Sequence, residues 1–180
     1  MNKKILILSG DPNSINSEII FKSWSRIKGS LKKKIYFISN YNLLNHQAKK
    51  INMSSKMVKT KGIYDLENDK RIKVIDLNLE FNNPFKVSKK DASKFIRSSL
   101  NLAHKLAKDK NVNGFINCAI DKKLLGTSNF GVTEYLASKC NIKNNSEVML
   151  IKNNNLAVSP ITTHVNVSQI SKKLKKSVII

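Results

Sequence analysis

Two kinds of apolar pattern alternate along the chain. Short runs rich in Ile, Val and Phe predict strands over residues 4–9, 33–40, 70–79 and 112–120, the first and the last of them buried. Between them, apolar residues spaced three or four apart predict helices over 17–27, 40–51, 88–108 and from 131 onward. The clearest is 88–108, where Ser88 is a good N-cap and Phe95, Leu102, Ala103 and Leu106 form one face. This alternation predicts a three-layer α/β domain with a mostly parallel sheet.

The last third of the chain has a weaker pattern. Residues 146–154 and 155–165 resemble two further strands, with a hairpin turn across 153–155, and 168–176 turns helical. The helix over 17–27 is expected to present Ile19, Ile20, Trp24 and Ile27 on one face. No internal repeat and no long Pro/Gly/Ser linker divides the 180 residues. We therefore expect one α/β region over 1–180.

The net charge of +21 suggests two interpretations. One is a polyanionic partner, above all nucleic acid. The other is compositional drift in an A·T-rich genome, because the chain is rich in Asn, Lys and Ile together. The basic residues are nearly all Lys, with only Arg26, Arg71 and Arg97, and they are spread along the chain. Since Arg is the residue that reads guanine edges and grips phosphate with two hydrogen bonds, we favour drift and expect no nucleic-acid partner.

The sequence also bears on compartment. No apolar run approaches the roughly 20 residues needed to span a bilayer. The N-terminal run in "MNKKILILSGDP" is too brief for a signal-peptide core and ends in Gly-Asp-Pro. We therefore expect a cytoplasmic protein without a membrane partner. Cys118 and Cys140 have no metal-binding spacing, and in a reducing compartment we expect two small buried thiols.

Four separated segments carry more specific information. The first, "SGDPNSINSEIIFKSW", is a strand end, a tight loop and a helix start, an arrangement that often holds an anionic group. The others are "INCAIDKKLL", "FGVTEYLASKC" and "AVSPITTHVNVSQI". In order and spacing all four resemble motifs of the 4-hydroxythreonine-4-phosphate dehydrogenases, the PdxA family. In the first motif Gly10, Asp11, Pro12, Ile15 and Glu18 are kept, whereas the residues between them depart from the family pattern.

The resemblance implies an isocitrate/isopropylmalate dehydrogenase-like α/β fold and a homodimer with its active site at the subunit interface. The implied enzyme is an NAD-dependent oxidoreductase of pyridoxal phosphate (pyridoxine, vitamin B6) biosynthesis. Its implied substrate is a small phosphorylated hydroxy amino acid, 4-phosphohydroxy-L-threonine, whose oxidation product loses CO2. A divalent metal (Zn, Co or Mg), held by three histidines, assists this reaction.

The resemblance also assigns candidate residues, each with a plainer alternative. His164 in "TTH" matches a metal ligand, or is a structural or surface histidine. Thr133 matches a substrate-binding residue, or is the N-cap of its helix. Its neighbour Val132 replaces the family's histidine and has no polar atom for a substrate. Asp11 and Lys122 are weaker loop candidates, whose alternatives are loop closure and a solvated lysine. His46 and His104 are expected on helix surfaces.

The matched motifs cover roughly the N-terminal half of a family member. The family builds its NAD site, its remaining metal ligands and most phosphate contacts from its second half. We therefore expect an incomplete, truncated chain with little or no activity by itself. One alternative is a non-catalytic binding or regulatory half-protein completed by a separate C-terminal chain. A second, suggested only by charge, is a nucleic-acid-binding module.

Overall fold

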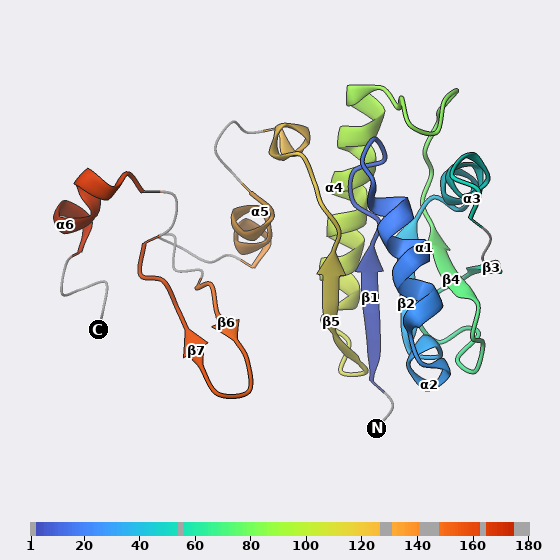
Figure 1. Ribbon diagram of the computed structural model, residues 1–180, viewed down its shortest axis with the longest axis horizontal. Helices are drawn as coiled ribbons and strands as arrows, with labels where there is room; N and C mark the ends of the chain where they lie inside the picture. The colour runs from blue at the N-terminus through green and yellow to red at the C-terminus, as the bar shows by residue number, and fades with distance from the viewer. Residues whose placement is uncertain (1–2, 54–55, 127–130, 141–147, 163–164, 175–180) are drawn as a thin grey trace.

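Five parallel strands form the central sheet of the protein (Figure 1). The computed structural model describes residues 3–53, 56–126, 131–140, 148–162 and 165–174. Along the sheet the strand order is β3-β4-β2-β1-β5, and every neighbouring pair is parallel. The strands are β1 (Lys4–Leu8), β2 (Ile35–Ser39), β3 (Met57–Thr60), β4 (Ile72–Asp76) and β5 (Val112–Asn117).

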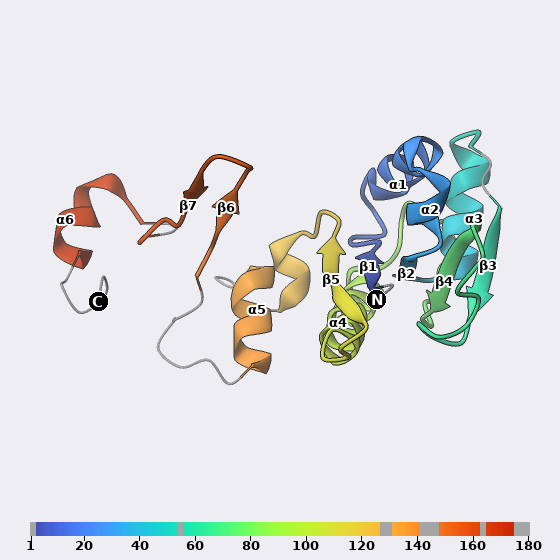
Figure 2. The same ribbon diagram turned by 90° about the horizontal axis from the view of Figure 1, so that it is seen from below.

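Helices cover both faces of this sheet (Figure 2). On one face lie α1 (Asn16–Arg26) and α3 (Tyr41–Lys50), and the short α2 (Gly29–Lys32) follows α1. The long α4 (Lys89–Leu106) covers the other face. The predicted three-layer α/β architecture with a mostly parallel sheet is confirmed.

Alternating side chains on the strands build a core on each side. Leu6 and Leu8 of β1 point towards α4, where they pack with Phe95 and Leu100. On the other face Phe37 of β2 packs edge-to-face on Trp24 of α1, with ring centroids 5.5 Å apart. Strands buried on both faces read as continuous apolar runs, which is why β1 and β2 were evident in the sequence.

Helix starts follow their capping residues. Ser88 caps α4, because its Oγ accepts a hydrogen bond from the Asp91 amide at 3.1 Å, as predicted. Asn40 caps α3 in the same way through the Leu43 amide at 2.7 Å. The apolar face expected for α4 is confirmed as well, since its residues are buried or pack against the core.

Several local expectations were wrong. The strand predicted over 112–120 ends at Asn117 and is largely exposed rather than buried. The reason is its place at one edge of the sheet that the described residues form, where β1 neighbours it on one side and no described strand lies on the other. The opposite edge strand, β3, and the short α2 were not predicted. On α1 the expected face is shifted, because Ile19 is 47% exposed and Phe21 is buried.

The segments after β5 lie beyond the β5 edge of the sheet (Figure 1). They are η1 (Lys122–Leu125), α5 (Val132–Lys139), β6 (Ile151–Lys152), β7 (Ala157–Val158), η2 (Val167–Gln169) and α6 (Ile170–Lys173). The strands β6 and β7 pair antiparallel, and the amide of Asn153 donates to the Leu156 carbonyl at 2.9 Å. The hairpin across 153–155 is thus confirmed, although its strands are far shorter than predicted.

The two cysteines differ in environment. Cys118, just after β5, is half-buried, whereas Cys140, just after α5, is exposed. The expectation of two buried thiols was therefore wrong: Cys118 is only partly covered beside the edge strand β5, and α5 leaves its last turn, with Cys140, open. Within the described ranges, no helix combines the length and apolar character that crossing a membrane requires.

Candidate functional site

The loops that follow β1 and β5 meet at the carboxyl edge of the sheet. The amide of Asp11 donates to the Ala119 carbonyl at 3.0 Å, and the side-chain Nδ2 of Asn16 donates to the same oxygen at 2.8 Å. Gly10, the residue before Asp11, has φ +72°. A Cβ at this position would lie 2.5 Å from the Ala119 oxygen, so only glycine fits the junction.

Side-chain amides clamp the first loop to its other neighbours. Asn13 donates from Nδ2 to the Val87 carbonyl at 2.9 Å, and its Oδ1 accepts from the Val87 amide at 2.7 Å. Gln47 of α3 donates from Nε2 to the carbonyls of Pro12 and Pro84, at 2.8 and 2.7 Å. These bonds tie the loops after β1, β4 and β5 into one assembly.

Sequence reasoning missed these amide residues. Asn13 and Asn16 fall in the part of the opening motif that departs from the family pattern. In the structure their side chains join the loop after β1 to the loops after β4 and β5. Gln47 could have been found, because it is a polar residue on the apolar face that Leu43 and Leu44 begin. A buried amide on such a face needs partners, and the loop carbonyls supply them.

Four buried polar atoms gather at the same edge: Ser9 Oγ, Asn16 Oδ1, Ser17 Oγ and Ser39 Oγ. They belong to the ends of β1 and β2 and to the first turn of α1. Among the described residues none of these atoms has a hydrogen-bond partner. In open α/β sheets the carboxyl ends of the strands are where ligands bind, and a helix N-terminus favours anions. This edge is therefore the candidate functional site.

The two carboxylates of the opening motif, Asp11 and Glu18, make local contacts. Asp11 accepts from the Asn13 amide at 2.9 Å through Oδ1, and its carbonyl accepts from the Ser14 hydroxyl at 2.7 Å. Glu18 forms an ion pair with Lys22, one helical turn later. The Asp11 contacts match its plainer role, loop closure, and the Glu18–Lys22 pair stabilises helix α1.

Lys122 and the start of α5 lie together. The Lys122 side chain passes 3.7 Å from the position a Cβ would take on Gly131, the N-cap of α5. The amide of Gly131 donates to Glu134 Oε2 at 2.7 Å. Thr133 lies two residues after the N-cap Gly131, so it is not the N-cap that the alternative interpretation required, and its side chain is exposed. Val132 is half-buried and packs against the core on the α4 side.

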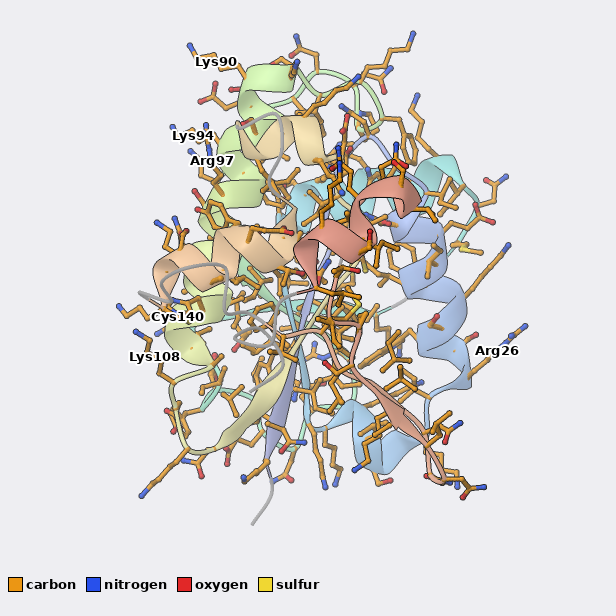
Figure 3. The ribbon with its side chains drawn as sticks, turned by 90° about the vertical axis from the view of Figure 1, so that its left-hand side faces the viewer. Arg26, Lys90, Lys94, Arg97, Lys108 and Cys140 are labelled. Atoms are coloured by element: carbon orange, nitrogen blue, oxygen red, sulfur yellow. The ribbon has the colours of Figure 1, made fainter. Side chains whose placement is uncertain are left out.

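Contacts with α4 position α5 (Figure 3). The hydroxyl of Tyr135 donates to Asn101 Oδ1 at 2.9 Å, and Cys140 Sγ lies 3.3 Å from His104 Nε2. His104 is thus half-buried between two helices, while His46 is exposed on α3 as expected. The second and third motifs are therefore brought together, with Lys122 and Thr133 at their junction.

The described residues do not assemble a metal site. Within the described ranges, no group of three or more His, Cys, Asp or Glu side chains could hold a metal ion. His164, the ligand that the resemblance names, lies outside the described residues. We therefore derive no catalytic step through a metal from this part of the chain.

Basic residues are spread over the surface. Figure 3 shows Lys90, Lys94 and Arg97 along the outer side of α4, with Lys108 beyond its end. Arg26 projects from α1 at the opposite margin of the same view. A nucleic-acid partner remains unfavoured as a prediction, because cations on both margins form no single track for a phosphate backbone.

The chain is similar to known proteins over nearly its whole length. A 4-hydroxythreonine-4-phosphate dehydrogenase of Sulfurihydrogenibium sp. (strain YO3AOP1) is 28% identical over 190 residues, which cover 98% of this chain and 54% of that protein. The chain thus spans about half the length of this curated relative.

Solved structures have the same fold. The 4-hydroxythreonine-4-phosphate dehydrogenase of Burkholderia phymatum matches with a TM-score of 0.84 at 20% identity, over 98% of this chain and 55% of that chain. The enzyme of that name from Klebsiella pneumoniae matches with a TM-score of 0.80 at 22% identity, over 98% and 56%. The sequence model of the pyridoxal phosphate biosynthetic protein PdxA matches residues 30–180, so the chain belongs to the PdxA family.

Proposed function

We propose that this chain is the N-terminal, substrate-contacting half of a 4-hydroxythreonine-4-phosphate dehydrogenase. The complete enzyme would oxidise 4-phosphohydroxy-L-threonine with NAD, and the product would lose CO2, in pyridoxal phosphate synthesis. The observation that carries the proposal is the family match over residues 30–180, because this range contains three of the four motifs. The clustering of the first, second and third motifs at the carboxyl edge of the sheet supports it.

Within this proposal the start of α5 contacts the anionic part of the substrate. Thr133 is exposed there, and its hydroxyl can donate to a phosphate or carboxylate oxygen. Lys122 lies beside the same helix start and supplies a positive charge. Val132 has no atom that could bind or protonate the substrate. We therefore expect weak or no turnover from the 180 residues alone.

NAD, a divalent metal (Zn, Co or Mg) and a homodimer complete the proposed enzyme. His164 is the metal ligand assigned in this chain, and further ligands would come from residues outside the described ranges. A single imidazole is a poor site for a catalytic divalent cation, which normally takes about three protein ligands. This gives a second reason to expect little activity from the chain by itself.

The test is an NAD reduction assay with 4-phosphohydroxy-L-threonine and added Zn²⁺, Co²⁺ or Mg²⁺. The chain is assayed alone, then with the C-terminal half of the Sulfurihydrogenibium relative supplied as a separate polypeptide. We expect no turnover alone, weak turnover with the added half, and an increase in the Val132→His variant. Thr133→Val in the Val132→His background should lower activity again. Robust turnover by the chain alone, or none from the complemented Val132→His variant, would contradict the proposal.

A second candidate is a non-catalytic binding or regulatory half-protein. Two observations favour it: Val132 stands at a position that the family fills with histidine, and residues 148–161 expose many large apolar side chains. Those more than 40% exposed are Val148, Met149, Leu150, Ile151, Leu156, Val158 and Ile161. Such a concentration of exposed apolar side chains in one segment fits a protein interface. Stable co-purification with the added C-terminal half, together with no turnover even in Val132→His, would favour this candidate over the enzyme.

A further inference from the structure

A pocket lies at the amino edge of the sheet, at the end opposite to the candidate functional site. Its volume is about 360 Å³, within the range of small-molecule sites, roughly 300–1,000 Å³. Figure 2 looks towards this end of the strands, where the N-terminus lies. The chain segments that lead into β1, β2 and β5, with the β3–β4 loop, line the pocket: Lys4, Lys33, Lys34, Tyr64, Glu67, Asn68 and Asn111.

One wall of the pocket is held by a hydrogen-bonded network. The hydroxyl of Tyr64 donates to Asp109 Oδ2 at 2.6 Å and accepts from Asn111 Nδ2 at 2.9 Å. Asp109 Oδ1 also accepts from the Asn111 amide at 2.8 Å. These bonds join the β3–β4 loop to the turn before β5, so the ring of Tyr64 has a fixed place before any ligand arrives.

Lys4 is fixed against the same wall. Its ammonium forms an ion pair with Glu67 and lies 4.4 Å from the centroid of the Tyr64 ring. The side chain is only 10% exposed, which is unusual for a lysine. Lys4 therefore presents a positive charge that is ordered and largely removed from bulk water.

The charge lining the pocket is unbalanced. Three lysines line it against a single carboxylate, Glu67, which already pairs with Lys4. Lys33 and Lys34 are half-buried, and among the described residues neither forms an ion pair. The nearby carboxylates are engaged elsewhere, Asp69 by Arg71 and Asp109 by Tyr64. Two ammonium groups thus remain available to a ligand.

A fourth lysine beneath the pocket adds to this charge. Lys73 is fully buried in β4, and its Nζ donates to the Lys33 carbonyl at 2.5 Å. The same ammonium lies 3.9 Å from the centroid of the Tyr36 ring. In the described part of the chain no carboxylate pairs with it. A buried ammonium that forms no ion pair adds to the positive potential beside the pocket, against the more distant charges of Asp69 and Glu67.

We propose that this pocket binds a small phosphate monoester or inorganic phosphate. A monoester carries roughly −1.5 to −2 charges at neutral pH, which matches the two available ammonium groups of Lys33 and Lys34. Lysines bind phosphate oxygens as point charges, and the side-chain amides of Asn68 and Asn111 are neutral donors beside them. A nucleic-acid backbone needs a track of cations over the surface, whereas these groups converge on one pocket.

This site is separate from the proposed substrate contacts, and its test does not depend on the dehydrogenase activity. The full chain is titrated with inorganic phosphate and with glycerol 3-phosphate at constant ionic strength, with chloride as the reference anion. Isothermal calorimetry gives the affinity, and amide chemical shifts of isotope-labelled protein report which residues respond. We expect saturable binding that shifts the side-chain amides of Asn68 and Asn111.

Matched variants distinguish phosphate binding in this pocket from general electrostatic attraction to a basic protein. Lys33→Gln with Lys34→Gln should weaken phosphate binding about tenfold or more, because two charge-assisted contacts are removed. Lys89→Gln with Lys90→Gln removes the same charge from the exposed first turn of α4 and should leave the affinity within about twofold. Lys122→Gln tests whether phosphate binds instead at the start of α5. Circular dichroism confirms that each variant is folded.

Three results would overturn the proposal. The first is equal weakening in both double variants, which would indicate general electrostatic attraction. The second is weakening by Lys122→Gln alone, which would place the phosphate at the carboxyl edge. The third is tight binding of single-stranded DNA with no saturable binding of inorganic phosphate or glycerol 3-phosphate, which would indicate a polymer surface.

Discussion

The two parts of this chain differ in how much core they bury. Residues up to the end of β5 form a five-stranded parallel sheet with helices on both faces, and Leu100 there is fully buried. After α5, the strands β6 and β7 are two residues long, and Leu156 between them is 62% exposed. Apolar burial is the main favourable term in folding. We infer that the first part supplies the stability of the chain, and that the second needs a partner surface to bury its apolar side chains.

The largest expected effect tests this comparison with one substitution made in both parts. Leu100→Ala should lower the free energy of unfolding by about 2–5 kcal/mol, because it leaves a cavity in a closed core. Leu156→Ala should change it by less than about 0.5 kcal/mol, because its side chain is already in water. Urea denaturation followed by circular dichroism measures both. A large loss in Leu156→Ala would mean that this part of the chain is packed in solution and would remove the contrast.

A second prediction concerns a charge buried within the first part. Burial lowers the pKa of Lys73 from 10.5 to about 8, against the opposing effects of Asp69 and Glu67. Between these two pH values the unfolded chain binds the proton and the folded chain does not, so stability should rise with pH across the window. The full gain would be at most about 3 kcal/mol. Below pH 8 both states are protonated and the cost of the buried charge is constant.

At higher pH, the ionisation of a neighbouring tyrosine opposes this gain in stability. Burial, with the charges of Glu67 and Asp65, raises the pKa of Tyr36 from 10.0 to about 12. Between these values the unfolded tyrosine ionises first, so this group lowers stability as the pH rises. Urea denaturation at pH 7.5, 9 and 10 should show the increase from Lys73. Lys73→Met should flatten it and raise the stability at pH 7.5 by about 1 kcal/mol. An unchanged pH slope in Lys73→Met would assign the effect to another group.

The contrast between the two parts also separates what the sequence could predict from what it could not. Strands such as β2 are buried on both faces, so their apolar runs and the helices between them identified the three layers. The edge strand β3, with the sequence "MVKT", mixes apolar and charged residues because it is only partly covered, and its pattern resembles a loop. The strands predicted over 146–154 and 155–165 were too long, because apolar residues without a packing partner look the same in sequence as core residues.

The candidate site was predictable in its backbone but not in its side chains. Gly10 was found because a strand, a glycine turn and a helix follow one another. Asn13, Asn16 and Gln47 act through partners 35 or more residues away, and no local pattern in one sequence contains such distances. The amino-edge pocket was unpredictable for the same reason, because Lys4, Lys33 and Asn111 converge only through the strand order.

A third prediction tests the junction of the β1 and β5 loops. Gly10→Ala should cost about 2 kcal/mol or more, since φ is +72° and the new Cβ would meet the Ala119 oxygen at 2.5 Å. Gly62→Ala is the matched control, because nothing lies within 4 Å of its added Cβ, and its stability should change by less than about 1 kcal/mol. Thermal denaturation compares the two. Equal effects would mean that the junction is not a tight contact in solution.

The smallest effect concerns the two thiols, one just after β5 and the other just after α5. Burial raises the pKa of the Cys118 thiol, which lowers its thiolate fraction at neutral pH, and its side chain is half-covered. Cys140 is exposed at the end of α5, and its Sγ lies 3.3 Å from His104 Nε2. Since the thiolate is the nucleophile, iodoacetamide at pH 7.5 should alkylate Cys140 at least about tenfold faster than Cys118.

Peptide mass spectrometry over a time course measures both alkylation rates in the same sample. His104→Gln removes the imidazole beside Cys140 but leaves the thiol accessible, so the Cys140 rate should stay well above the Cys118 rate, which should not change. In 6 M urea the two rates should converge, because both burial and the His104 contact are lost. If Cys140 reacts as slowly as Cys118 in the folded chain, then the end of α5 is covered in solution, and this part of the surface is an interface.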